Sequence, residues 1–356
     1  MTKERISKVK DTFNKINIDG LYVTNITNVR YLTGFTGSAG SLLIVGEKNH
    51  FFTDGRYTEQ VKKQVKNCVI HIVSGSHIKG IKDNNLLSKG LRIGFESHHV
   101  SYANYSALKE SISNIGWVQT SGIIEEIAAV KDKGEIDHLK KAIEITDVVF
   151  DEIIKEIKEG VSENKIAALI SYKFKQHGAE GDSYDPIVAS GWRSALPHAR
   201  PTDKVLEKGD FVVMDFGALF EGYHADMTRT ILIGSPTEKH KEIYKTVLDS
   251  HLNGIKKAKA GVSGAEVDEA CRSVIDSAGY GNYFNHSTGH GIGLEVHTHP
   301  RLSSINKEPL LENYVVTIEP GIYIPDWGGV RIEDDCWIKK ELCVPLNKST
   351  KELISL

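Results

Sequence analysis

The chain of 356 residues is short of cysteine and has no long apolar run. Its four cysteines, Cys68, Cys271, Cys336 and Cys343, form no C-x-x-C pair, which argues against a zinc knuckle or a thioredoxin motif and favours buried free thiols. No stretch approaches the ~20 apolar residues of a membrane span. The first residues, MTKERISKVKDTFNKI, lack the apolar core of a signal peptide. We therefore expect a cytoplasmic protein.

The chain also lacks an excess of charge of either sign. Lys plus Arg number 44 against 47 for Asp plus Glu, and a net charge of -3 gives no basic field for nucleic acid or an anionic membrane. The motifs G-x-S-x-G and H-E-x-x-H are missing, which removes the usual support for a serine hydrolase or a zincin. The stretch GFTGSAG (34–40) has no G-K-[ST] ending, so we interpret it as a glycine-rich turn.

The composition, with 40% hydrophobic and 26% charged residues, is that of a soluble globular protein, and the length fits two domains. Apolar spacing predicts a helix over 1–16, and short β-branched runs after it predict strands. The predicted strands are 21–25, 41–45, 51–54, 68–73 and 92–96, with a helix at 57–65. This pattern indicates an amino-terminal α/β domain. We place its boundary near 123–133, which gives domains of residues 1–125 and 126–356.

The second domain begins with a long amphipathic pattern. Apolar residues at helical spacing from Glu135 predict a helix that ends at Gly160, and Ser162 is the expected N-cap of a helix reaching His177. Further predicted elements are strands at 211–220 and 228–234, helices at 239–259 and 264–278, and a strand-rich C-terminal third. Because strands and helices do not alternate strictly there, we predict an α+β fold rather than a doubly wound sheet.

Four acids and one histidine stand in settings that suggest a shared site: Asp215, Asp226, His290, Glu319 and Glu333. Each acid taken singly could equally be a turn cap or a surface ion-pair partner. Together, however, carboxylates at strand ends would repel one another unless a cation lay between them. Two divalent ions about 3.5–4 Å apart, held by carboxylates and a single imidazole, meet this requirement and generate a hydroxide at neutral pH.

In the contexts MDFG, ADMTRT, STGHGIG, TIEPGIY and GVRIED, these five residues resemble the metal ligands of the pita-bread metallopeptidases, which include methionine aminopeptidase, aminopeptidase P and proline dipeptidase. YLTGFTGSAG and FFTDGRY resemble the creatinase-like amino-terminal domain of the prolidase and aminopeptidase P branch. The resemblance implies a smaller creatinase-like α/β domain followed by a pita-bread catalytic domain. It also implies a dinuclear site in which Asp226 and Glu333 bridge and His290 is the one metal-binding histidine.

The resemblance assigns roles to residues beside the metals as well. His198, in LPHARP, matches a histidine at the active-site mouth that contacts substrate, although it could be a surface-loop residue. His297 matches a histidine that stabilises the developing oxyanion. Glu319 is expected to take the proton of the nucleophilic water and to pass it to the leaving nitrogen. His286 matches a pocket histidine of the proline-specific members, but it could equally be a packing residue.

Three further residues bear on substrate binding. Arg301 stands in V-H-T-H-P-R, where prolidases often carry an arginine that binds the dipeptide's carboxylate, and this favours a proline dipeptidase. It could instead pair with a surface acid, so aminopeptidase P remains the alternative. Arg331 matches an arginine that orients a carboxylate ligand, and Tyr323 is expected in the same pocket. The sequence departs from many relatives at Thr298, where they carry an acid.

The expected reaction is hydrolysis of Xaa-Pro peptide bonds by a hydroxide that bridges two divalent ions. Manganese is the expected metal, with cobalt, zinc or iron open, because carboxylate-rich sites accept each of them. The expected partners are small peptides with proline in the second position and a second copy of the chain, since homodimers are common among the relatives. A metal-free member of the fold and a creatinase-like amidinohydrolase conflict with the complete ligand set. The ~120-residue amino-terminal domain argues against a methionine aminopeptidase.

Overall fold

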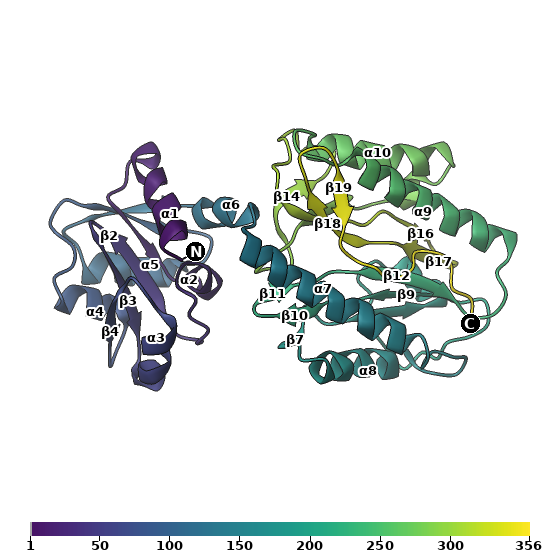
Figure 1. The fold of residues 1–356 in the computed structure, drawn as a ribbon, viewed down its shortest axis with the longest axis horizontal. Coiled ribbons are helices and arrows are strands. Elements are labelled where there is room, and N and C mark those ends of the chain that lie inside the picture. The colour runs from purple at the N-terminus through teal and green to yellow at the C-terminus, as the bar shows by residue number, and fades with distance from the viewer. Residues whose placement is uncertain (1) are drawn as a thin grey trace. The chain divides into compact units, whose positions relative to one another are not determined.

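The computed structural model describes residues 2–356 and divides into two compact units, Met1–Ala128 and Ala129–Leu356 (Figure 1). Helices and strands occur in both units, so the chain mixes the two as predicted. Among the described residues, no helix is both long enough and apolar enough to cross a membrane.

A six-stranded mixed sheet in the order β4-β3-β2-β1-β5-β6 forms the centre of the first unit. β1 pairs antiparallel with β2 and parallel with β5, and every strand predicted here is present, although β6 was not predicted. The strands are β1 (Gly20–Val23), β2 (Ser41–Val45), β3 (Lys48–Thr53), β4 (Val69–Ile72), β5 (Arg92–Glu96) and β6 (Gly116–Thr120). The helices are α1 (Thr2–Ile16), α2 (Ile26–Thr33), η1 (Gly55–Tyr57), α3 (Thr58–Gln64), α4 (His77–Asp83), α5 (Tyr102–Ser111) and α6 (Ile123–Ala129).

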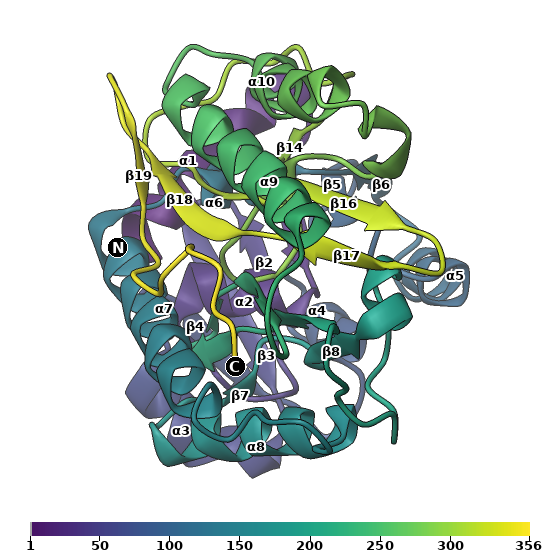
Figure 2. The same ribbon diagram turned by 90° about the vertical axis from the view of Figure 1, so that its right-hand side faces the viewer.

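The second unit contains two pairs of helices with antiparallel strands between them. Figure 1 shows α7 and α8 on one side of the strands and α9 and α10 on the other, and the view in Figure 2 agrees. The helices are α7 (Lys133–Ile153), α8 (Glu163–Gln176), η2 (Gly191–Ala195), α9 (Glu238–Lys257), α10 (Gly264–Ser277) and η3 (Gly281–Tyr283). Each pair covers its own strands, and the two largest buried apolar clusters of this unit lie against these pairs.

The strands of the second unit form small sheets. Those that bear on the site are ordered β12-β9-β8 and β14-β13-β15-β18-β19, with β16 and β17 as a separate hairpin and β11-β10-β7 as a third small sheet. They are β7 (Gly181–Asp182), β8 (Ile187–Ser190), β9 (Phe211–Asp215), β10 (Ala218–Phe220), β11 (Tyr223–His224), β12 (Thr228–Leu232), β13 (Gly289–Gly291), β14 (Thr298–Leu302), β15 (Val315–Ile318), β16 (Gly321–Ile324), β17 (Gly328–Arg331), β18 (Asp334–Ile338) and β19 (Cys343–Pro345).

The two large apolar clusters contain residues of different helices and strands. Residues of α7 and α8, such as Phe150 and Phe174, pack with residues of β8, β9 and β12. Residues of α9 and α10, such as Val247 and Cys271, pack with residues of β15 to β18. Apolar side chains on the inner faces of amphipathic helices therefore fix both groups of strands in place.

The long helix α7 ends earlier than its sequence pattern predicted. It begins with a capping box between Asp132 and Glu135, but it ends at Ile153 rather than at Gly160. The backbone then turns, because Ile157 is buried in the core of this half and the Gly160 N–H donates to the Leu206 carbonyl (2.9 Å). Tertiary contacts thus end the helix where apolar periodicity alone would continue it.

A close backbone approach brings the first two predicted ligands together. β9 and β12 are antiparallel with Asp215 opposite Thr228, and the chain between them returns so that Asp226 lies beside Asp215. Gly217 lies where the two arms of this return meet, since a β-carbon there would be 1.7 Å from the Ala225 carbonyl oxygen. Only glycine fits this contact without moving the backbone.

We predict that Gly217→Ala destabilises the second unit by about 1–3 kcal/mol, the usual cost of overpacking, and weakens divalent-metal binding by moving Asp226 away from Asp215. Urea denaturation and calorimetric titration with Mn²⁺ would measure the two effects. Gly181→Ala is the matched control, because a β-carbon there meets only the end of the Lys175 side chain at 3.7 Å. Equal stability of the two variants would contradict the prediction.

Candidate metal centre and active site

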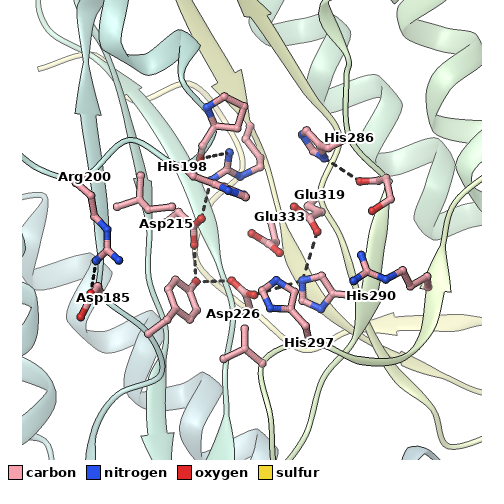
Figure 3. Close-up of a pocket in the computed structure, with 17 residues that line it drawn as sticks. Asp185, His198, Arg200, Asp215, Asp226, His286, His290, His297, Glu319 and Glu333 are labelled. Atoms are coloured by element: carbon pink, nitrogen blue, oxygen red, sulfur yellow. Dashed lines mark hydrogen bonds and ion pairs between the residues drawn. The ribbon is translucent and has the colours of Figure 1, made fainter. Parts of the chain in front are cut away.

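A cavity of about 660 Å³ opens in the second unit, and its lining includes every predicted site residue except Tyr323 (Figure 3). Tyr323 lies behind the wall, where its hydroxyl contacts His286 and Arg331. The predicted residues that line the cavity are His198, Asp215, Asp226, His286, His290, His297, Arg301, Glu319, Arg331 and Glu333. Residues separated by more than a hundred positions therefore meet at one site.

The five predicted ligands lie at the ends of strands or in the connections between strands. Ligand atoms of Asp226, His290 and Glu333 lie within 4.8 Å of one another, a spacing that fits one metal ion. The His290 Nε2 atom is 3.4 Å from Glu319 Oε1 and 3.7 Å from Asp226 Oδ2. Asp215 joins the group through the Tyr184 hydroxyl, which contacts both Asp215 and Asp226.

The carboxylates of this group are held in an unfavourable environment. Burial, and then repulsion from neighbouring carboxylates, raises the pKa of Asp226 and of Glu333 well above their usual ranges. Burial also raises the pKa of Glu319. In addition, Oε1 of Glu333 is buried without any hydrogen-bond partner among the described residues. Divalent cations between these oxygens would offset both costs, so the donor set fits a carboxylate-rich dinuclear metal site.

His290 is prepared to act as a neutral ligand. Burial lowers its pKa to about 4, so that the ring carries no charge at neutral pH. Its Nδ1 lies 3.1 Å from the Gly291 carbonyl oxygen, and an N–H donated there leaves the Nε2 lone pair facing the carboxylates. His297 packs beside it, with ring centroids 4.3 Å apart, and burial lowers its pKa to about 4 as well.

Arg331 orients two of the acids. Its Nη2 donates to Asp215 Oδ2 (2.6 Å), and its Nε donates to Thr228 Oγ1 (2.9 Å). The Thr228 hydroxyl in turn donates to Glu333 Oε2 (2.6 Å). One buried guanidinium therefore fixes one carboxylate directly and another through a threonine, as partners of metal ligands commonly do.

The other predicted residues lie around the opening and the walls. His286 Nε2 is 2.9 Å from the Tyr323 hydroxyl, and burial lowers the pKa of this histidine. His198 is exposed where the segment after η2 borders the cavity. Arg301 also lines the cavity, and its guanidinium forms no ion pair with a carboxylate among the described residues. His299 lies apart from the cavity lining, 3.8 Å from the exposed Glu308 carboxylate.

Several residues of the site were not predicted from the sequence. Tyr184 bridges two acids, Asp185 and Arg200 form an exposed ion pair on the wall, and the Asp335 carboxylate accepts the Asp226 N–H (2.9 Å). Tyr184, Asp185 and Arg200 do not stand in a distinctive sequence pattern. Asp335 could have been found from the sequence, because it stands two residues after Glu333 in a run of three acids that leads into an apolar strand.

Comparison with known proteins agrees with this geometry. Residues 137–340 match metallopeptidase family M24, and residues 5–130 match the creatinase/prolidase N-terminal domain. The chain is 39% identical to a Xaa-Pro dipeptidase of Pyrococcus horikoshii, with 99% of each chain covered. A structure of a Xaa-Pro dipeptidase from Bacillus anthracis is 44% identical, with a TM-score of 0.96 and all of both chains covered. The X-Pro aminopeptidase structure from Thermotoga maritima is 40% identical, with a TM-score of 0.90 and 96% and 98% covered.

These matches confirm the predicted architecture. A creatinase-like amino-terminal domain precedes a pita-bread domain, and the mixed helix and sheet content is that of an α+β fold. The division of the structure after Ala128 falls close to the end of the amino-terminal match at residue 130.

We predict opposite stability effects of Glu333→Gln with and without metal. Without divalent ions the substitution raises the melting temperature, because it removes a buried carboxyl group whose ionisation is disfavoured by burial and by the neighbouring acids. With Mn²⁺, the wild type gains stability, about 2.7 kcal/mol at a concentration 100 times Kd, and the variant gains much less. Thermal melts with chelator and with Mn²⁺ would measure both.

Glu341→Gln provides the control for this pair of melts, since Glu341 is an exposed carboxylate outside the cavity lining and its variant should behave as wild type in both. A variant at 333 that responds to Mn²⁺ as strongly as the wild type would show that Glu333 is not a ligand.

Proposed function

We propose that this chain, which belongs to metallopeptidase family M24, hydrolyses Xaa-Pro peptide bonds with two divalent ions held by Asp215, Asp226, His290, Glu319 and Glu333. The observation that carries the proposal is the convergence of three buried acids, the partly buried Glu319 and one neutral imidazole on one cavity (Figure 3). Relatives named Xaa-Pro dipeptidase, which match the chain over nearly their whole length, support the substrate class.

The ions would supply a nucleophilic hydroxide and polarise the scissile carbonyl, as paired metals do in other hydrolases. Glu319 lies beside His290 at the cavity and is the carboxylate placed to accept a proton from the attacking water and to return it to the leaving nitrogen. His297, next to His290, is placed to donate to the developing oxyanion. A neutral ring suits that role, because the burial that lowers its pKa still leaves one N–H to donate.

The wall residues would select the substrate. His198 is proposed to contact the peptide at the mouth, and His286 is proposed to shape the proline pocket together with Tyr323. Arg301 supports a dipeptidase, because its guanidinium faces the cavity without a carboxylate partner among the described residues and suits the terminal carboxylate of a dipeptide. The position of Arg301 at the cavity favours the role in substrate binding over the alternative that it pairs with a surface acid.

An Xaa-Pro aminopeptidase acting on longer peptides is the second candidate, supported by the similarity to the Thermotoga maritima X-Pro aminopeptidase. Manganese is proposed as the metal, because four carboxylates and one imidazole suit it, although cobalt, zinc and iron bind similar donors. The homodimer and the cytoplasmic location stay predictions of the sequence.

The protein loaded with Mn²⁺ is expected to cleave Ala-Pro faster than Ala-Pro-Ala and to leave Met-Ala-Ser intact, because only the dipeptide presents its carboxylate next to the proline. Release of free amino acids, followed by chromatography, would measure the three rates. Faster cleavage of Ala-Pro-Ala would replace the dipeptidase with the aminopeptidase, and cleavage of neither proline peptide would refute the proposed function.

Arg301→Ala is expected to raise KM for Ala-Pro by roughly 10- to 100-fold with kcat nearly unchanged, since the lost contact is a charge-assisted hydrogen bond to a part of the substrate that does not react. Steady-state kinetics would separate the two constants. Arg200→Ala is the comparison, because Arg200 lines the same cavity but is already paired with Asp185. If Arg301→Ala leaves KM unchanged, Arg301 does not bind the carboxylate.

A further inference from the structure

Glu163, the first residue of α8, is a buried carboxylate outside the cavity. Its exposed fraction is 0%, and both of its oxygens are fully engaged. Oε1 accepts the Ser190 N–H (2.8 Å) and hydroxyl (3.0 Å), and Oε2 accepts the Thr202 N–H (3.0 Å) and hydroxyl (2.9 Å). The Arg193 Nε donates to both oxygens, at 3.3 and 3.1 Å. A charge buried this completely is tolerated only with such a set of donors.

The residues that Glu163 holds are the two ends of one segment. Ser190 is the last residue of β8 and Thr202 follows the segment, so each oxygen of the carboxylate secures one end. The Arg193 guanidinium also joins the two arms of the segment, because its Nη2 donates to the Arg200 carbonyl (2.5 Å). Residues 190–202 therefore form a loop whose base is fastened to the N-terminus of α8.

This loop carries part of the proposed substrate site. Its middle contains His198, exposed at the edge of the cavity, and Arg200 on the cavity wall. Near the middle it is held by the Arg331 Nη1 bond to the Pro197 carbonyl (3.3 Å) and by the exposed Arg200–Asp185 ion pair. Ser194 adds a further contact, accepting the Gly329 N–H (2.8 Å). The position of the exposed His198 imidazole therefore depends on these contacts and on the base of the loop.

We propose that Glu163 is a positioning residue: its carboxylate fixes the base of the loop 190–202 and thereby places His198 over the cavity. The inference rests on the proposed function, because it assigns to Glu163 an effect that is exerted on substrate through His198. A displacement of about 1 Å at a group that contacts substrate commonly costs up to ~10²-fold in rate, so a residue remote from the chemistry can matter this much.

The test uses the full chain loaded with Mn²⁺ and the variant Glu163→Gln, which keeps the size of the side chain but turns one acceptor oxygen into a donor. Hydrogen exchange in 190–202 is expected to rise at least ~10-fold, because one end of the loop loses its acceptor. The kcat/KM for Ala-Pro is expected to fall by up to ~10²-fold, while the number of Mn²⁺ ions bound stays the same. Glu163→Asp, which keeps the charge, should restore part of both.

A double-mutant cycle with His198→Ala separates positioning from general destabilisation. If Glu163 acts through His198, Glu163→Gln lowers kcat/KM by less than about 2-fold in the His198→Ala protein, since coupled residues are not additive. The same loss in both backgrounds would overturn the proposal, as would unchanged exchange in 190–202. If Glu163→Gln does not fold, Thr202→Val, which removes a single hydroxyl from one end, takes its place in the same cycle with smaller effects.

Asp147→Asn is the matched control. Asp147 is also a buried carboxylate that accepts two backbone N–H groups and a hydroxyl, but these belong to Lys348 and Ser349 near the C-terminus. In the Asp147→Asn variant, hydrogen exchange should rise near Lys348 and Ser349 and not in 190–202. The effect of this substitution on kcat/KM should be the same with His198 present and with His198→Ala. A wild type that does not cleave Ala-Pro would refute the proposed function alone, because the exchange measurements still decide whether Glu163 fixes the loop.

Discussion

Repulsion between buried carboxylates is the constraint on which the second unit depends. Burial alone disfavours a charged Asp226 or Glu333, and each acid adds to the cost of the others. The surrounding hydrogen bonds relieve only part of this cost, since one oxygen of Glu333 has no partner among the described residues. The fold thus keeps a site that is unfavourable by itself and becomes favourable when cations bind, and the side chains around it serve to keep the acids from moving apart.

Backbone contacts place the acids, and a few side chains then orient them. Asp215 and Asp226 are joined by the return of the chain at Gly217, and His290 and Glu319 lie on or next to neighbouring strands, β13 and β15. Arg331 and Thr228 then set the directions of the carboxylates. Short, buried strands suit this task, because paired backbones fix the positions of side chains more closely than loops do.

The sequence identified five candidate ligands, and the structure brings all five to one cavity. Each of them stands in a short recognisable context, such as Asp215 and Glu319 at the ends of apolar runs. The sequence predicted poorly what tertiary contacts decide. The end of α7 is an example, since apolar periodicity continues past Ile153 while the backbone turns to bury Ile157. Tyr184 is another, because a tyrosine that bridges two acids is not distinguished from any other buried tyrosine until the fold is known.

The origin of the ligands within the fold has a further consequence. Asp215 and Asp226 come from the strands that α7 and α8 cover, whereas Glu319 and Glu333 come from the strands that α9 and α10 cover. Ions bound to all of them would add a link between two groups of strands that the Arg331–Asp215 and Thr228–Glu333 hydrogen bonds already join. They would then act as a further cross-link within one chain, and the free energy of unfolding of this domain would rise with the concentration of the metal.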